Sequence, residues 1–169
     1  MTTVFERDAE TRRVALRTPA GLFAFGFGSG LARFAPGTMG TLAAVPFALL
    51  LKQLPPFAYG AAVAVLFLAG VWFCGAASRA LGRHDPGGIV WDEMVGYWLT
   101  VALLPPDWGW WLAAFVLFRF FDILKPWPIR QVERRFAGGL GIMLDDVVAA
   151  LYAMLALAGA QYLLAQAAA

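Results

Sequence analysis

The sequence predicts an all-α protein, a polytopic membrane bundle of about five membrane-associated helices. Hydrophobic residues make up 61% of its 169 residues. Charged residues make up 14%, against about 25% in soluble domains. Uncharged runs cover residues 34–51, 53–78, 94–106, 108–118 and 147–169, and about 20 apolar residues suffice for a helix to cross the hydrocarbon core. The alternative is an unusually apolar soluble helical bundle.

The first 20 residues are polar, and they lack the apolar core of a cleavable signal peptide. We therefore expect residues 1–20 to form a polar cytoplasmic segment and residues 21–169 to form a single helical domain. The one cysteine, Cys74, lies inside an apolar run. It is expected to pack in the core, because no second cysteine is present to form a disulfide.

The five membrane helices differ in how well their runs fit a bilayer. The runs at 53–78 and 147–169 are long enough to span without help from their neighbours. The other three reach spanning length only as extended helices, at about 38–53, 89–104 and 108–124. At about 1.5 Å per residue, these three either span with little tilt or are partly re-entrant.

A short amphipathic helix is predicted within PIRQVERRFAGG, residues 128–139, with apolar side chains on one face and basic side chains on the other. Such a helix lies in the headgroup plane and attracts anionic lipid, whereas a plain cytoplasmic loop is the alternative. We expect Gly138, Gly139 and Gly141 to end it. The chain would then return into a fifth membrane helix that begins at Asp145.

The basic residues indicate the orientation of the helices. Threading five helices from an inside N-terminus places twelve of the 13 Lys and Arg residues on the cytoplasmic side, as the positive-inside rule requires. Only Lys52, in the turn KQLPPF, falls outside. This asymmetry favours an odd number of crossings, with the N-terminus inside and the C-terminus outside.

The same threading places five carboxylates at one depth, near the inner surface: Asp92, Glu93, Asp122, Asp145 and Asp146. Like charges gathered in this way repel one another unless protons or cations lie between them. Carboxylate oxygens are ligands that suit Mg²⁺, which fills the rest of its octahedron with water and phosphate. All five acids are therefore candidate metal ligands.

The alternative for each acid is an ordinary ion pair at the membrane boundary. It is strongest for Asp122, because Arg119 and Lys125 lie three residues away on either side along one helix. No basic residue lies within four positions of the other four acids. Charged groups at membrane depth are usually functional, which favours a metal or phosphate role for those four.

A glycine-rich stretch, GFGSGLARFAPGTMGT, precedes the first membrane helix. Glycines allow the backbone to approach a ligand closely, and a helix N-terminus attracts anions. The alternative is an ordinary helix entry after Pro36, and the absence of a following lysine excludes a Walker A loop. The candidate phosphate-binding residues are Gly28, Ser29, Gly30, Arg33, Thr38, Thr41, Arg119 and Lys125.

Residues that the chain lacks narrow the chemistry further. His84 is the only histidine, so a phosphatase site built on paired histidines is excluded. Cys74 is remote from any basic loop, which excludes a cysteine phosphatase. A formal net charge of only +2 gives no indication of nucleic-acid binding. Of the phosphatase chemistries considered, these exclusions leave metal-assisted phosphoryl chemistry.

Four blocks of the chain resemble the signature blocks of the phosphatidylglycerophosphatase A family. They are FGSGLARFAPGTMGTLAAVP, DPGGIVWDEMVGYWL, FRFFDILKPWPI and GGLGIMLDDVVAALYA, and they cover residues 25–153 in order. The resemblance implies a Mg²⁺-dependent, all-helical bacterial enzyme that removes the terminal phosphate of phosphatidylglycerol phosphate. It would act at the cytoplasmic face of the inner membrane, on an anionic phospholipid, with no obligatory protein partner. Its catalytic candidates are Asp92, Asp122, Asp145 and Asp146.

Two other functions remain open at this point. One is a membrane phosphatase for another lipid or a polyprenyl phosphate. The other is a small cation transporter, whose acids would bind the transported ion. A transporter typically carries its ionisable groups near the bilayer midplane, whereas the middles of these spans carry no charge.

Overall fold

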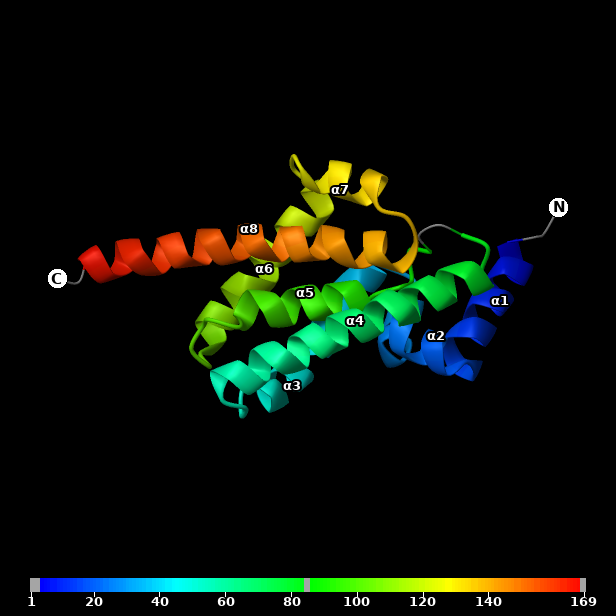
Figure 1. The fold of residues 1–169 in the computed structure, drawn as a ribbon, viewed down its shortest axis with the longest axis horizontal. Helices are drawn as coiled ribbons and strands as arrows, with labels where there is room; N and C mark the ends of the chain where they lie inside the picture. Colours follow the sequence, from blue (N-terminus) through cyan, green and yellow to red (C-terminus); the bar gives the residue numbers. More distant parts are fainter. Residues whose placement is uncertain (1–3, 84–85, 168–169) are drawn as a thin grey trace.

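The computed structural model describes residues 4–83 and 86–167, and within these ranges the predicted all-helical fold is confirmed (Figure 1). His84 lies outside them. The elements are α1 (Val4–Arg17), α2 (Pro19–Ala24), the 3-10 helix η1 (Gly26–Leu31), α3 (Pro36–Leu51), α4 (Pro56–Ala80), α5 (Trp91–Val101), α6 (Trp108–Leu124), α7 (Ile129–Arg135) and α8 (Gly138–Ala167).

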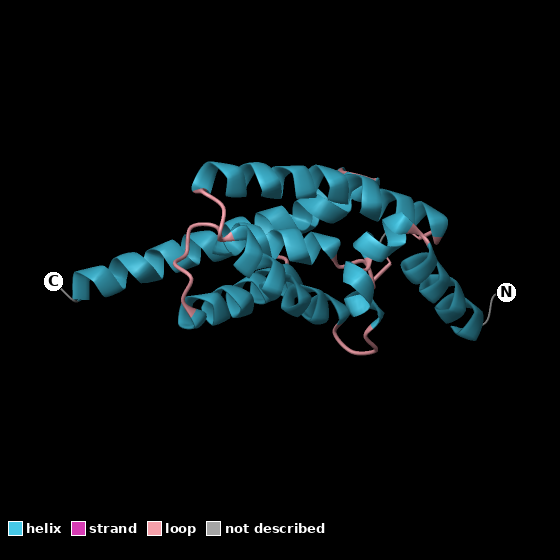
Figure 2. Ribbon diagram, turned by 90° about the horizontal axis from the view of Figure 1, so that it is seen from below, coloured by secondary structure: helices cyan, strands magenta, loops and turns pink. Residues whose placement is uncertain are grey.

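Helix α8 is the hub of the bundle, because it packs against α4, α5, α6 and α7. The α3–α4 and α5–α6 turns lie at the end of the bundle from which α8 projects (left in Figure 1), and α1 and α2 lie at the opposite end. Figure 2 shows the same arrangement at right angles, with helices throughout and loops only between them. The starts of α5 and α8 and the end of α6 therefore point away from the projecting C-terminus.

Aromatic side chains fix α5 in the middle of the core. Trp98 is 2% exposed, and its indole N–H donates to the carbonyl of Ala44 in α3 over 2.9 Å. The Tyr59 hydroxyl in α4 donates to the carbonyl of Trp98 over 2.6 Å. Buried indole and phenol groups need such partners, so these bonds hold α3 and α4 in register against α5.

Local signals set several helix ends. Asp107 caps α6 by accepting a hydrogen bond from the Trp110 amide over 3.0 Å. The Lys52 ammonium donates to the carbonyls of Ala102 and Leu104, both at 2.8 Å. It thereby satisfies backbone acceptors that the end of α5 leaves without helical partners. Burial lowers the pKa of Lys52 from its ordinary value.

Two helices, α4 and α8, are long and apolar enough to cross a membrane, and α3 is a shorter apolar helix. Their outward faces carry large apolar side chains, with Leu68 of α4 68% exposed and Leu155 of α8 72% exposed. Extended exposed apolar surface of this kind marks an interaction with lipid or protein. The structure therefore supports membrane association, while the five crossings stay a prediction.

Helix α5 is shorter than the helix expected over 89–104, because it begins at Trp91 and ends at Val101. Residues 86–90 instead form a turn that packs against η1. A Cβ atom at Gly30 would lie 2.0 Å from the carbonyl oxygen of Gly88, so the two backbones touch. The contact between these segments limits the start of the helix, next to the local turn residues Pro86, Gly87 and Gly88.

The expected start of the last helix is wrong. Helix α8 begins at Gly138, about two turns before Asp145. Gly138 does make the turn, with φ +68, but Gly139 lies inside the helix. A Cβ atom there would lie 1.9 Å from the carbonyl oxygen of Val71, so this glycine allows close packing on α4 rather than a helix end.

Candidate active site

The structure brings the five predicted acids together from three helices. Asp92 and Glu93 lie in the first turn of α5, Asp122 lies near the end of α6, and Asp145 and Asp146 lie in α8. The carboxyl groups of Asp92 and Glu93 lie close to each other, as do those of Asp122 and Asp146. The convergence predicted from their common depth is therefore present in the fold.

Three of these acids form the tightest group. Asp92, Glu93 and Asp146 each offer one carboxylate oxygen, and these oxygens lie within 4.8 Å of one another. Asp92 Oδ1, Glu93 Oε2 and Asp146 Oδ2 are buried without a hydrogen-bond partner among the described residues. An unsatisfied buried acceptor is costly, and three oxygens of this kind make a donor set that fits a hard divalent cation.

Two basic side chains enter the acid cluster from the end of α6. Arg119 Nη1 lies 2.5 Å from Asp122 Oδ2 and 3.5 Å from Glu93 Oε1. Lys125 Nζ lies 2.6 Å from Asp145 Oδ2. With all groups ionised, the five carboxylates would exceed these two cations by three charges. The residual negative charge favours binding of a cation.

The pairing of Lys125 with Asp145 could not be read from the sequence, because the two residues are 20 positions apart. Asp145 also fixes the local geometry of its own helix. Its Oδ1 accepts a hydrogen bond from the Asp146 amide over 3.0 Å. Asp145 is thus held by α6, while its neighbour Asp146 is directed toward α5.

The N-terminus of α3 also faces the cluster, at Gly37. A Cβ atom at Gly37 would lie 2.1 Å from Glu93 Oε1 and 2.9 Å from both terminal nitrogens of Arg119. The positive end of the helix therefore lies beside the acids and the guanidinium. Arg119 Nε is buried without a hydrogen-bond partner among the residues described, which leaves a donor for an anionic oxygen. Gly37 belongs to the glycine-rich stretch that the sequence indicates as a phosphate-binding loop, but its contact with Glu93 and Arg119 could not be read from the sequence.

The glycine-rich stretch before α3 is used mainly for packing. Gly28 adopts φ +96, and a Cβ atom there would contact only Leu16. Gly30 abuts Gly88, as described above. The Ser29 hydroxyl donates to the Gly26 carbonyl over 2.8 Å, and the Thr41 hydroxyl donates to the Gly37 carbonyl over 2.9 Å. These contacts of Gly28, Ser29, Gly30 and Thr41 do not reach the acids, which the stretch meets at Gly37. Its role in phosphate binding stays a prediction.

The remaining residues that the sequence singles out differ in their exposure. Thr38 is half-buried in the first turn of α3, next to Gly37. Arg33 is exposed in the loop before α3. Cys74 is buried, as predicted, with Sγ 3.8 Å from the Met143 sulfur.

Comparison with known proteins finds relatives among the phosphatidylglycerophosphatases. The family model for phosphatidylglycerophosphatase A matches residues 22–161. The phosphatidylglycerophosphatase A of Escherichia coli (strain K12) is 47% identical over 144 residues, covering 85% of this chain and 84% of that protein. The one from Haemophilus influenzae is 46% identical over 153 residues, covering 89% and 94%.

A relative from Bacteroides thetaiotaomicron is 42% identical over 151 residues, covering 85% of this chain and 94% of that protein. Its provisional name is phosphatidylinositol-3-phosphatase. No solved structure matches the chain. The matches span the acids and both basic partners, and the chain belongs to the phosphatidylglycerophosphatase A family and is a phosphoric monoester hydrolase.

Proposed function

We propose that the protein hydrolyses phosphatidylglycerol phosphate to phosphatidylglycerol and inorganic phosphate, with Mg²⁺ as its cofactor. The names of two relatives that are 46–47% identical support the substrate. The apolar helices α4 and α8 support a site in the bacterial inner membrane. The basic residues predicted to lie inside support a reaction at the cytoplasmic face.

One observation carries the metal part of the proposal: three buried carboxylate oxygens converge without partners, on Asp92, Glu93 and Asp146. These residues would hold the cation, with Asp122 and Asp145 completing the acidic surroundings. When bound, Mg²⁺ neutralises charge on the phosphate and makes a bound water more acidic.

The chain's own cations are placed to bind the phosphate. Arg119 is 13% exposed at its side chain, so its guanidinium is poorly screened by water and binds a phosphate oxygen strongly. The N-terminus of α3 adds a positive dipole at Gly37. Lys125 approaches the same cluster through Asp145. These groups would hold the phosphate monoester against the acids.

Phosphate release from phosphatidylglycerol phosphate in detergent micelles, with Mg²⁺, with EDTA and after Mg²⁺ is restored, tests the proposal. We expect activity to vanish in EDTA and to return with the metal. Calorimetric binding of Mg²⁺ alone should weaken in Asp92→Asn and remain unchanged in Asp8→Asn, an exposed aspartate of α1. Full activity in EDTA would contradict the metal role and leave the substrate assignment standing.

A second substrate is favoured by the relative from Bacteroides thetaiotaomicron. Its name indicates an inositol lipid whose phosphate is also a monoester on a glycerolipid headgroup. Parallel assays with phosphatidylglycerol phosphate, phosphatidylinositol 3-phosphate and a polyprenyl phosphate compare the candidates. A higher kcat/KM for either of the last two would replace the proposed substrate.

A further inference from the structure

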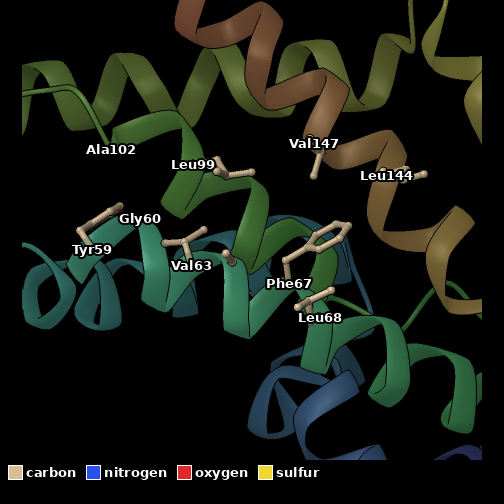
Figure 3. Close-up of a pocket in the computed structure, with 10 residues that line it drawn as sticks. Tyr59, Gly60, Val63, Phe67, Leu68, Leu99, Ala102, Leu144 and Val147 are labelled. Carbon is tan, nitrogen blue, oxygen red and sulfur yellow. The ribbon is translucent and has the colours of Figure 1, made fainter. Parts of the chain in front are cut away.

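An apolar cavity of about 500 Å³ opens between α4, α5 and α8 (Figure 3). Its walls include Gly60, Val63 and Phe67 of α4, Leu99 of α5, and Leu144 and Val147 of α8. The phenol of Tyr59 also lines it, but its hydroxyl is bound to the carbonyl of Trp98. The lining therefore suits a hydrocarbon and offers nothing to a polar ligand.

The α8 wall of this groove is formed by the two residues that flank the adjacent acids in the chain. Leu144 directly precedes Asp145, and Val147 directly follows Asp146. The opposite end lies at Gly60, near the α3–α4 turn. Along α4, Gly60 and Leu68 are separated by about 12 Å, which approaches half of a hydrocarbon core about 30 Å thick. A lipid whose headgroup lay at the acids would have one tail directed along this path.

We propose that the groove binds one acyl chain of the phospholipid substrate. The inference rests on the proposed function, because it assigns the tail of a lipid whose phosphate binds at the acid cluster. Two of the three helices that form the groove are the apolar helices α4 and α8, so it opens toward the hydrocarbon phase. If an acyl chain of the substrate, rather than bulk lipid, occupies the groove, turnover depends on the length of that acyl chain.

Gly60 offers a way to shorten the groove without disturbing the site. It is exposed, and a Cβ atom there would meet no atom within 4 Å. Gly60→Trp therefore places an indole at the far end of the groove. Gly159→Trp is the matched control, because Gly159 is also helical and open but lies in the projecting part of α8.

The experiment compares palmitoyl and hexanoyl forms of phosphatidylglycerol phosphate in one detergent. Burying one methylene raises affinity roughly fourfold. Displacing two or three methylenes of the acyl chain from the groove should therefore lower the affinity for long-chain substrate. We expect Gly60→Trp to lower the ratio of long-chain to short-chain kcat/KM by roughly 16- to 64-fold. Gly159→Trp should keep the wild-type ratio.

An unchanged ratio in Gly60→Trp would overturn the proposal and indicate that bulk lipid fills the groove. If Gly60→Trp fails to fold, Ala64→Phe, another lining position on α4, gives the same comparison with the same expected direction. Failure of the wild-type protein to hydrolyse either form would instead refute the proposed substrate. The two hypotheses can therefore fail separately.

Discussion

Adding one methyl group at Gly37 is expected to reduce turnover while the fold survives. The new Cβ atom of Gly37→Ala would lie 2.1 Å from Glu93 Oε1, whereas ordinary carbon contacts lie at about 3.5–4.0 Å. The carboxylate must therefore retreat by more than about 1 Å. Glu93 is a long side chain, so its movement is cheap for folding but removes an oxygen from the candidate metal site.

The magnitude follows from the geometry of the site. A displacement of about 1 Å in a catalytic group lowers the rate by roughly 100-fold. Folding itself should change little, because alanine is favoured over glycine in a helix by about 0.5–1 kcal/mol, which offsets the crowding. We expect kcat to fall about 100-fold and the Mg²⁺ concentration for half-maximal rate to rise.

The assay is phosphate release across a Mg²⁺ titration, with a thermal melt on the same samples. Gly159→Ala serves as the control, because that helical glycine has no neighbour within 4 Å of an added Cβ. A kcat for Gly37→Ala within twofold of wild type would refute the argument that Glu93 must stay in place. A large loss of melting temperature would show that the methyl group disturbs packing instead.

Three further predictions concern the acids and the topology. Asp92→Asn and Asp146→Asn should each lower kcat by at least about 100-fold with an unchanged melt, since their unpartnered oxygens would become weaker neutral ligands; wild-type rates would remove either residue from the ligand set. Asp122→Asn should raise the Mg²⁺ requirement, whereas Lys125→Ala should raise KM at an unchanged Mg²⁺ requirement; superimposable titrations for Asp122→Asn and wild type would leave only its ion pair with Arg119. Reporter fusions at the two ends of the chain should report opposite sides of the membrane, and a shared side would require an even number of crossings.

Helix positions could be predicted where the sequence carries its own boundary signals. The expected helix over 108–124 matches α6, because Asp107 caps its start. The expected helix over 38–53 differs from α3 by two residues at each end, since Pro36 and the prolines of the following turn limit it. Uncharged runs, prolines and capping residues are local signals, so these helix ends can be read from the sequence.

Other boundaries depend on contacts between distant segments. Helix α5 starts late because the turn at 86–90 packs on Gly30, and α8 starts early because Gly139 fits against Val71. Residues 1–20 are polar in composition, yet α1 buries Val14 and Ala15. Composition shows how polar a segment is, but it does not show which backbone a small residue will pack against.

Charge and depth were enough to predict the acid cluster, but not the partner of each acid. The sequence shows Arg119 next to Asp122 along one helix, and the structure keeps that pair at 2.5 Å. It cannot show that Arg119 also reaches Glu93 or that Lys125 reaches Asp145, because those contacts join different helices. Glu93 and Asp145 therefore have cationic partners that their sequence neighbours did not indicate.

The adjacency of Asp145 and Asp146 follows from the geometry of α8. Consecutive side chains on a helix point about 100° apart, so two adjacent residues can face two different neighbouring helices. Asp145 meets Lys125 at the end of α6, and Asp146 meets Asp92 and Glu93 at the start of α5. Since α8 packs on both helices, the pair ties Lys125, the lysine proposed to bind the phosphate, and the candidate metal ligands to one rigid element.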